Sequence, residues 1–274
     1  MLTAGCDIGA LTTKAAVIED GRMLGCEVVR SRPKAVQSAT DVMDKLLGRL
    51  GLSYPQIDYC ISTGYGRNLV HFAQSNISEI SCHGRGAHWL APSVRTIIDG
   101  GGQDCKAIRV DHNGGLVDFR MNCKCAAGTG KALELMARSL GVDVSELGPL
   151  SLKAKDPVQM NKPCCILTQI DVKRHVFDGR DRADIAAGAN DMVAREIMHL
   201  VRDVGQENEV AVTGGVANNA GLVKCLEYYL GVVTVRFDVD PQLIGAIGAA
   251  VLAADKYRKL TAGQSDGGTM ERKS

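Results

Sequence analysis

The sequence predicts an α/β protein made of two related lobes, and three observations lead to this prediction. The chain has 274 residues, which allows one large domain or two smaller lobes. Hydrophobic residues make up 45% of the chain and charged residues 23%, so it can form a sizeable core. A strand–turn–strand pattern at the N-terminus also occurs a second time downstream, and a repeated supersecondary unit indicates duplication.

An aspartate, a glycine turn and a lysine define this repeat. In the first copy, Asp7 lies at the end of a predicted strand and Lys14 begins the next strand. In the second copy, Asp99 and Lys106 hold the same positions, again seven residues apart and again with an alanine after the lysine. Each copy then continues through a predicted hairpin into a third strand.

Apolar spacing predicts the remaining elements. Strands are expected over 2–8, 14–18, 23–29, 57–62, 97–98, 106–110, 116–121 and 210–212. Helices are expected over 36–50, 132–140, 166–175, 185–204 and 243–254. We place a first lobe at 1–95, a second at 96–242, a C-terminal helix 243–260 that packs back on the first lobe, and a disordered tail at 261–274.

The composition argues against several classes of function. Lysine and arginine total 32 and aspartate and glutamate 31, so the net charge of +1 argues against a nucleic-acid or membrane-surface binder. The longest uncharged apolar stretch, 243–254, is shorter than the about 20 residues that span a bilayer. The chain shows no secretory signal, so its ten cysteines indicate a reducing, cytoplasmic location rather than a disulfide scaffold.

Two turns have the chemistry of phosphate sites. Glycine lets the backbone approach a phosphate, free N–H groups bind its oxygens, and the strand-end aspartate can hold the metal counter-ion. Gly9 follows Asp7 in the first turn, and Gly101 and Gly102 follow Asp99 in the second. A third element with a strand-to-helix form begins at 213, where a nucleoside could lie close to the backbone.

The order of these turns resembles the actin, sugar kinase and Hsp70 ATPase superfamily. The resemblance implies two ribonuclease-H-like lobes with a nucleotide cleft for Mg-ATP between them. Asp99 would then contact Mg²⁺ through water, and Gln103 would position the attacking water. The alternative for both residues is turn capping by short polar side chains.

Cys125 and the pair Cys164-Cys165 are distinguished from the other cysteines because a predicted helix follows each. A helix N-terminus lowers the pKa of a thiol and would favour an anionic iron–sulfur cluster. Two ligands from each of two chains would complete a four-cysteine cluster. The alternative is that these cysteines are buried or incidental.

A further set of motifs covers nearly the whole chain apart from its tail. It comprises DIG at 7–9, TTKA at 12–15, STGYGR at 62–67, EISCH at 79–83, GGQD at 101–104, CAAGTG at 125–130, TGGVA at 213–217 and PQLIGAIGAA at 241–250. Together they resemble the activators of 2-hydroxyacyl-CoA dehydratases and the related ATPase subunits of benzoyl-CoA reductases.

The resemblance implies a homodimer, or a pair with a homologous subunit, that holds one [4Fe–4S] cluster. ATP hydrolysis would drive a low-potential electron to an acyl-CoA dehydratase or reductase, with ferredoxin or flavodoxin as donor. Cys125 matches one cluster ligand and Cys164 the other, with Cys165 as the alternative; Cys123 departs from the family pattern. The implied nucleotide contacts are Asp7, Gly9, Ala10, Thr12, Thr13, Lys14, Gly101, Gly102, Gly214, Gly215 and Gln242.

Two rival functions remain at this stage. One is a small-molecule kinase of the same fold without a cluster, and the other is a nucleotide-gated assembly protein without redox chemistry. Iron content separates both from the electron donor, and phosphorylation of an added acceptor separates the two rivals.

Overall fold

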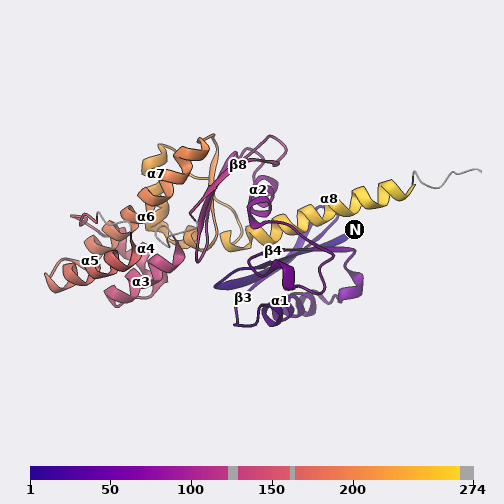
Figure 1. Cartoon of the computed structure of the whole chain (residues 1–274), viewed down its shortest axis with the longest axis horizontal. Coiled ribbons are helices and arrows are strands. Elements are labelled where there is room, and N and C mark those ends of the chain that lie inside the picture. The colour runs from indigo at the N-terminus through magenta and orange to yellow at the C-terminus, as the bar shows by residue number, and fades with distance from the viewer. Residues whose placement is uncertain (123–128, 161–163, 266–274) are drawn as a thin grey trace, which may run out of the picture. The chain divides into compact units, whose positions relative to one another are not determined.

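The computed structural model describes residues 1–122, 129–160 and 164–265 (Figure 1). It forms two compact units. One comprises Met1–Gly86 with the chain from Gly245 onward, and the other is Ala87–Ile244. The lobe bounds expected from the sequence, 1–95 and 96–242, stay a prediction.

The first unit is built on a five-stranded sheet in the order β3-β2-β1-β4-β5. The strands are β1 (Leu2–Ile8), β2 (Thr12–Glu19), β3 (Arg22–Arg30), β4 (Tyr59–Gly64) and β5 (Ser75–Asn76). Its helices are α1 (Ala35–Leu50), the start of α2 (Glu79–Leu90) and α8 (Ile244–Ser265). In Figure 1, α1 and α8 lie on opposite sides of this sheet.

Strand β1 is buried on both faces, which explains why its sequence does not alternate between apolar and polar residues. Alternate residues such as Ala4 and Cys6 pack in a core cluster with α1. On the other face, the Thr3 hydroxyl donates a hydrogen bond to the carbonyl oxygen of Ala250 at 3.1 Å. A Cβ atom on Gly5 would overlap the α8 backbone at Ala246 and Ala250, so glycine permits this close helix–strand packing.

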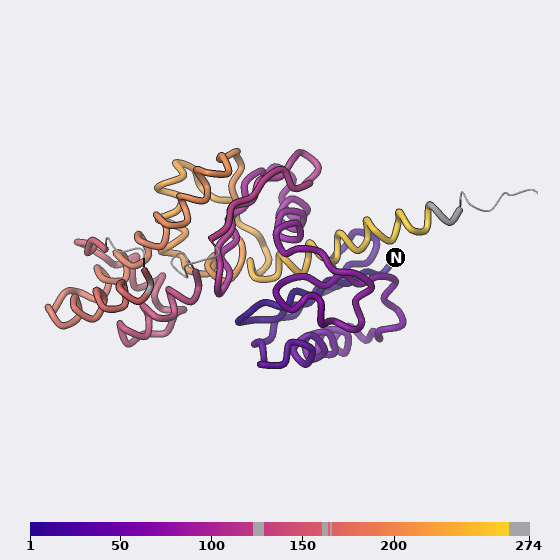
Figure 2. The backbone as a smooth tube through the Cα atoms, in the orientation of Figure 1, coloured from indigo at the N-terminus to yellow at the C-terminus, as the bar shows by residue number. Residues whose placement is uncertain are grey.

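The second unit has a four-stranded sheet in the order β8-β7-β6-β9. The strands are β6 (Thr96–Gly100), β7 (Cys105–Val110), β8 (Leu116–Met121) and β9 (Val210–Thr213). The helices are α3 (Gly130–Leu140), α4 (Val144–Ser151), α5 (Cys165–Phe177), α6 (Arg182–Val204) and α7 (Ala220–Leu230). The backbone trace shows these helices gathered beside the sheet (Figure 2), and their apolar residues form one core with β6, β7 and β9.

The two sheets repeat the same arrangement, which confirms the predicted duplication. The order β3-β2-β1-β4 matches β8-β7-β6-β9, with the inner strand antiparallel to one neighbour and parallel to the other. Asp7 lies opposite Lys14 in the first sheet, and Asp99 opposite Lys106 in the second. The seven-residue spacing from aspartate to lysine in both copies therefore corresponds to the same strand register in both sheets.

The structure differs from the sequence prediction mainly by containing extra helices. Helices α2 and α4 were not expected, because glycines interrupt α2 and Pro149 lies inside α4. Helix α7 was expected only as the end of a strand-to-helix element that begins at 213, without bounds. Helix α8 continues through residues 261–265, the first part of the segment expected to be disordered; 266–274 lie outside the described residues.

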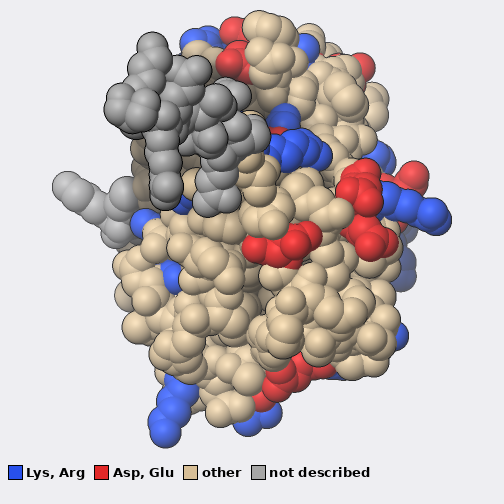
Figure 3. Space-filling view, turned by 90° about the vertical axis from the view of Figure 1, so that its right-hand side faces the viewer, with Lys and Arg blue, Asp and Glu red and all other residues tan. Residues whose placement is uncertain are grey.

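Within the described ranges, no helix is both long and apolar enough to cross a membrane. On the face drawn in Figure 3, basic and acidic side chains lie interspersed among other residues.

The close approach of β1 and α8 predicts opposite effects for two glycine-to-alanine changes. Gly5→Ala should lower the free energy of unfolding by about 1–3 kcal/mol, because its methyl group would overlap backbone. Gly48→Ala is the matched control, since its added Cβ meets nothing within 4 Å on α1, and it should raise stability by about 0.4–1 kcal/mol. Urea unfolding followed by circular dichroism measures both; equal stabilities would contradict the described packing.

Candidate functional site

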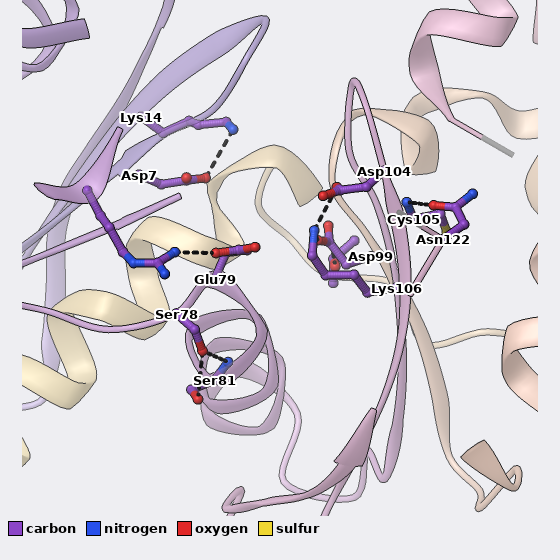
Figure 4. Close-up of polar contacts among 12 residues, drawn as sticks. Asp7, Lys14, Ser78, Glu79, Ser81, Asp99, Asp104, Cys105, Lys106 and Asn122 are labelled. Atoms are coloured by element: carbon purple, nitrogen blue, oxygen red, sulfur yellow. Dashed lines mark hydrogen bonds and ion pairs between the residues drawn. The ribbon is translucent and has the colours of Figure 1, made fainter. Parts of the chain in front are cut away.

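In the first unit, Asp7 and Lys14 form a buried ion pair where β1 and β2 meet the turn (Figure 4). Oδ2 of Asp7 lies 3.0 Å from Nζ of Lys14, and the side chains are 5% and 12% exposed. The pair follows from the antiparallel register, which places the two residues directly opposite each other. Each charge compensates the other's loss of water.

Hydrogen bonds within the hairpin fix the turn between these strands. The Gly9 N–H group donates to the carbonyl oxygen of Thr12 at 3.1 Å. The Ser31 hydroxyl donates to the carbonyl oxygen of Gly9 at 2.8 Å and lies 2.9 Å from the hydroxyl of buried Thr13. Ala10 is exposed at the tip. The predicted residues of the first turn therefore lie together in one hairpin.

Residues distant in the sequence enclose the Asp7 carboxylate. A Cβ on Gly64, whose φ is +83°, would lie 2.5 Å from Oδ1 of Asp7. A Cβ on Gly245 would lie 3.1 Å from Oδ2 of Asp7 and 2.7 Å from Nε2 of the buried His83. These three residues were not among the predicted site residues. A Thr-Gly pair lies at the end of both β4 and β9, with each threonine in register with the strand-end aspartate, and this repeat could have indicated Gly64.

In the second unit, Lys106 lies between two carboxylates (Figure 4). Its Nζ is 2.7 Å from Oδ1 of Asp104 and 3.7 Å from Oδ2 of Asp99. The Thr213 hydroxyl donates to Oδ1 of Asp99 at 3.4 Å, and a Cβ on Gly214 would lie 2.7 Å from that same oxygen. The strand-end aspartate is thus enclosed as in the first unit, with one additional acid.

The second glycine turn is bound to the start of α3. The Gly101 N–H group donates to the carbonyl oxygen of Asp104 at 2.9 Å. The carbonyl oxygens of Gly101 and Gly102 accept hydrogen bonds from the N–H groups of Gly130 and Lys131, each at 2.9 Å. These bonds satisfy two N–H groups that a helix start leaves unpaired within the helix.

Gln103 is exposed at the tip of this turn. It follows Asp99 by four positions, and its water-positioning role stays a prediction.

The three remaining nucleotide residues also lie together. The Gly214 N–H group donates to the carbonyl oxygen of Pro241 at 2.9 Å, and a Cβ on Gly215 would lie 3.9 Å from Oε1 of Gln242. A cavity of about 130 Å³ lies beside them, lined in part by Ala217 and Phe237. The expected strand-to-helix transition passes through a short 3₁₀ helix, Gly215–Asn218, before α7 begins.

Cys164 occupies the N-cap position of α5 and is half-buried. The backbone N–H groups of Leu167 and Ile166 lower the pKa of its thiol below the ordinary value, as expected for a thiol at a helix start. Cys165 is the first residue of α5. Cys123 and Cys125 lie outside the described residues.

Other described cysteines have a different environment. Burial raises the pKa of the Cys60 and Cys82 thiols to about 12 each, which suits a packing role. Within residues 1–122, 129–160 and 164–265, no three histidine, cysteine or acidic side chains gather as a metal site.

A comparison with protein families gives a match over residues 4–253 to the BadF/BadG/BcrA/BcrD ATPase family. The chain is 38% identical to the 2-hydroxyisocaproyl-CoA dehydratase activator of Clostridioides difficile, over 94% of this chain and 97% of that protein. It is 32% identical to one of the subunits of the benzoyl-CoA reductase of Thauera aromatica, over 94% of this chain and 95% of that protein.

Solved structures confirm the predicted fold class. The activator of the 2-hydroxyisocaproyl-CoA dehydratase from Clostridium difficile with bound ADPNP gives a TM-score of 0.91 at 36% identity, covering 100% of both chains. A ROK family glucokinase from Streptomyces griseus gives 0.55 at 13% identity, covering 93% of this chain and 100% of that one, and shows a shared fold alone. The chain therefore has two ribonuclease-H-like lobes of the actin–sugar kinase–Hsp70 type.

The lowered pKa of Cys164 predicts selective alkylation of metal-free protein. At neutral pH a larger fraction of Cys164 is thiolate than of Cys225, whose pKa burial raises to about 11, although both are half-buried. Iodoacetamide should therefore modify Cys164 first, and its rate should reach a plateau at lower pH. Peptide mass spectrometry across a pH series measures this; faster modification of Cys225 would contradict the described helix start.

Proposed function

The chain belongs to the BadF/BadG/BcrA/BcrD ATPase family, and from this we propose that it is an ATP-hydrolysing iron–sulfur protein. It passes a low-potential electron to a partner of the 2-hydroxyacyl-CoA dehydratase or benzoyl-CoA reductase type. Ferredoxin or flavodoxin is the expected donor. The relatives named above support the activator ATPase role.

The observation that carries the proposal is the attachment of the second glycine turn to α3. Gly101 and Gly102 accept hydrogen bonds from the first residues of that helix, and Cys125 precedes Gly130 by five positions in the chain. A change in the turn on nucleotide binding would act directly on the segment that carries the proposed cluster ligand. In this proposal, hydrogen bonds join the nucleotide turn to the start of α3, five positions after Cys125 in the chain.

The nucleotide part of the proposal rests on both turns. The N–H groups of Gly9 and Gly101 are bonded within their turns, so the neighbouring N–H groups of Ala10 and Gly102 would bind phosphate oxygens. The nucleoside would lie near Gly214, Gly215 and Gln242. Asp7 and Asp99 have the acidic oxygens that Mg²⁺ prefers, and both are buried where charge is weakly screened. Gln103 would orient the attacking water.

The cluster part rests on the chemistry of Cys164. A half-buried thiol whose pKa is lowered at a helix start fits a thiolate ligand. Cys125 and Cys164 from each of two copies would hold one [4Fe–4S] cluster. When bound, the cluster supplies a one-electron carrier whose potential the surrounding hydrogen bonds and solvent exposure set.

The exposed apolar residues of helix α5 support the binding of a second copy of the chain next to Cys164. Ile166, Ile170 and Phe177 are exposed on the helix that begins next to Cys164, and Phe177 is 90% exposed. Positions 166, 170 and 177 share one side of a helix. An apolar side of this kind marks an interaction surface, and we assign it to the partner subunit of the proposed homodimer.

Iron content tests this function. Protein purified without oxygen should contain about two irons and two sulfides per chain, because two copies would share four irons. Cys164→Ser should lose the cluster and still bind nucleotide, whereas Cys225→Ser, a half-buried cysteine of α7, should keep it. Iron that persists in Cys164→Ser but is lost in Cys165→Ser would move the ligand by one position. Protein that holds no iron after anaerobic reconstitution would contradict the cluster and would indicate an ATPase or a kinase without redox chemistry.

The contact between the turn and α3 predicts a variant that separates hydrolysis from electron transfer. An added Cβ at Gly130 would lie 3.3 Å from the carbonyl oxygen of Gly101, tighter than ordinary packing. Gly130→Ala should keep most ATPase activity and lower the electrons transferred per ATP by about three- to tenfold, since mutations between coupled sites cost about 0.5–2 kcal/mol of coupling. Gly48→Ala is the control. A full yield of electrons in Gly130→Ala would exclude this route.

A further inference from the structure

The two units treat their strand-end aspartates differently, although the register is the same. In the first unit the lysine opposite the aspartate binds it directly, with Lys14 Nζ 3.0 Å from Asp7. In the second unit the equivalent Lys106 is 3.7 Å from Asp99 and instead approaches Asp104 to 2.7 Å.

One sequence position accounts for this difference. Asp104 lies five residues after Asp99, and the residue five positions after Asp7 is Thr12, which carries no charge. Lys106 and both carboxylates are at most 5% exposed, so their mutual attraction is weakly screened. The three groups carry a formal charge of −1, whereas Asp7 and Lys14 together carry none.

We propose that Asp104 is a positioning residue that holds the Lys106 ammonium away from Asp99 and so keeps the Asp99 carboxylate able to bind a divalent cation. The inference rests on the proposed Mg-nucleotide site. It also assigns the cation to the second turn rather than the first, because a lysine in direct contact competes with a metal ion for the same oxygen. The neighbouring Thr213 hydroxyl supports the other oxygen of Asp99.

Removing the Asp104 charge should convert the second unit to the arrangement of the first. In Asp104→Asn the Lys106 ammonium has Asp99 as its nearest carboxylate and moves onto it. In Lys106→Met no ammonium competes with the metal ion for Asp99, so Asp104 has no lysine to hold away from that carboxylate. Asp104→Asn combined with Lys106→Met should therefore behave like Lys106→Met alone, an interaction between mutations that a general loss of structure does not produce.

Mn²⁺ binding in the presence of ADPNP, followed by the electron paramagnetic resonance signal of free Mn²⁺, tests the proposal without turnover. Asp104→Asn should raise the Mn²⁺ dissociation constant about tenfold or more, the usual cost of losing a group that supports a metal ligand. Asp104→Glu, which keeps the charge, should stay near wild type. Asp118→Asn, an exposed acid of β8, is the matched control and should have no effect.

Two results would overturn the proposal: wild-type affinity in Asp104→Asn, or a double variant that binds Mn²⁺ more weakly than Lys106→Met. Should Asp104→Asn not fold, the comparison of the double variant with Lys106→Met still decides, because the double variant removes the buried charge together with its partner. Wild-type protein that binds no Mn-nucleotide would instead refute the proposed function itself.

Discussion

The burial of a carboxylate at the end of a central strand is the constraint on which the rest of the structure depends. Asp7 and Asp99 lie where the sheet ends and solvent is excluded, so each charge needs a partner. The antiparallel neighbour supplies a lysine at the directly opposite position in both units. Close backbone at Gly64 and Gly214 then encloses each carboxylate, since any side chain there would occupy the same space.

Duplication has kept this framework and changed its electrostatics. The first unit balances one acid with one base, and the second adds Asp104. A site that must hold both phosphate and a divalent cation needs donors for the one and spare negative charge for the other. In the proposed function, the additional charge of Asp104 makes the second turn the better place for the cation.

In the second unit, the glycine turn is joined to a helix that begins far along the chain. Hydrogen bonds from Gly130 and Lys131 make the glycine turn part of the start of α3. Because these two N–H groups have no partner within the helix, a shift of the turn breaks their hydrogen bonds unless the helix start moves with it. The proposed function uses this connection as its physical route from the turn to α3.

Much of the site was predictable where its residues are close in sequence. Asp7, Gly9, Thr13 and Lys14 belong to one hairpin, so spacing and turn chemistry were sufficient to bring them together. The helical pattern that follows identified the pair Cys164-Cys165, and the family resemblance selected Cys164 from it. Gly64, His83 and Gly245 lie in the motifs of the resemblance but were not predicted as site residues, since they reach Asp7 only through the packing of β4, α2 and α8.

The sequence by itself determined the α/β class, the duplicated hairpins and the residues that line each turn, because these depend on local periodicity and on register within one hairpin. Only the tertiary structure decided that Lys106 lies closer to Asp104 than to Asp99. Only the tertiary structure joined the second turn to α3. Distances of about an ångström distinguish such pairings, and side-chain packing sets them rather than sequence spacing.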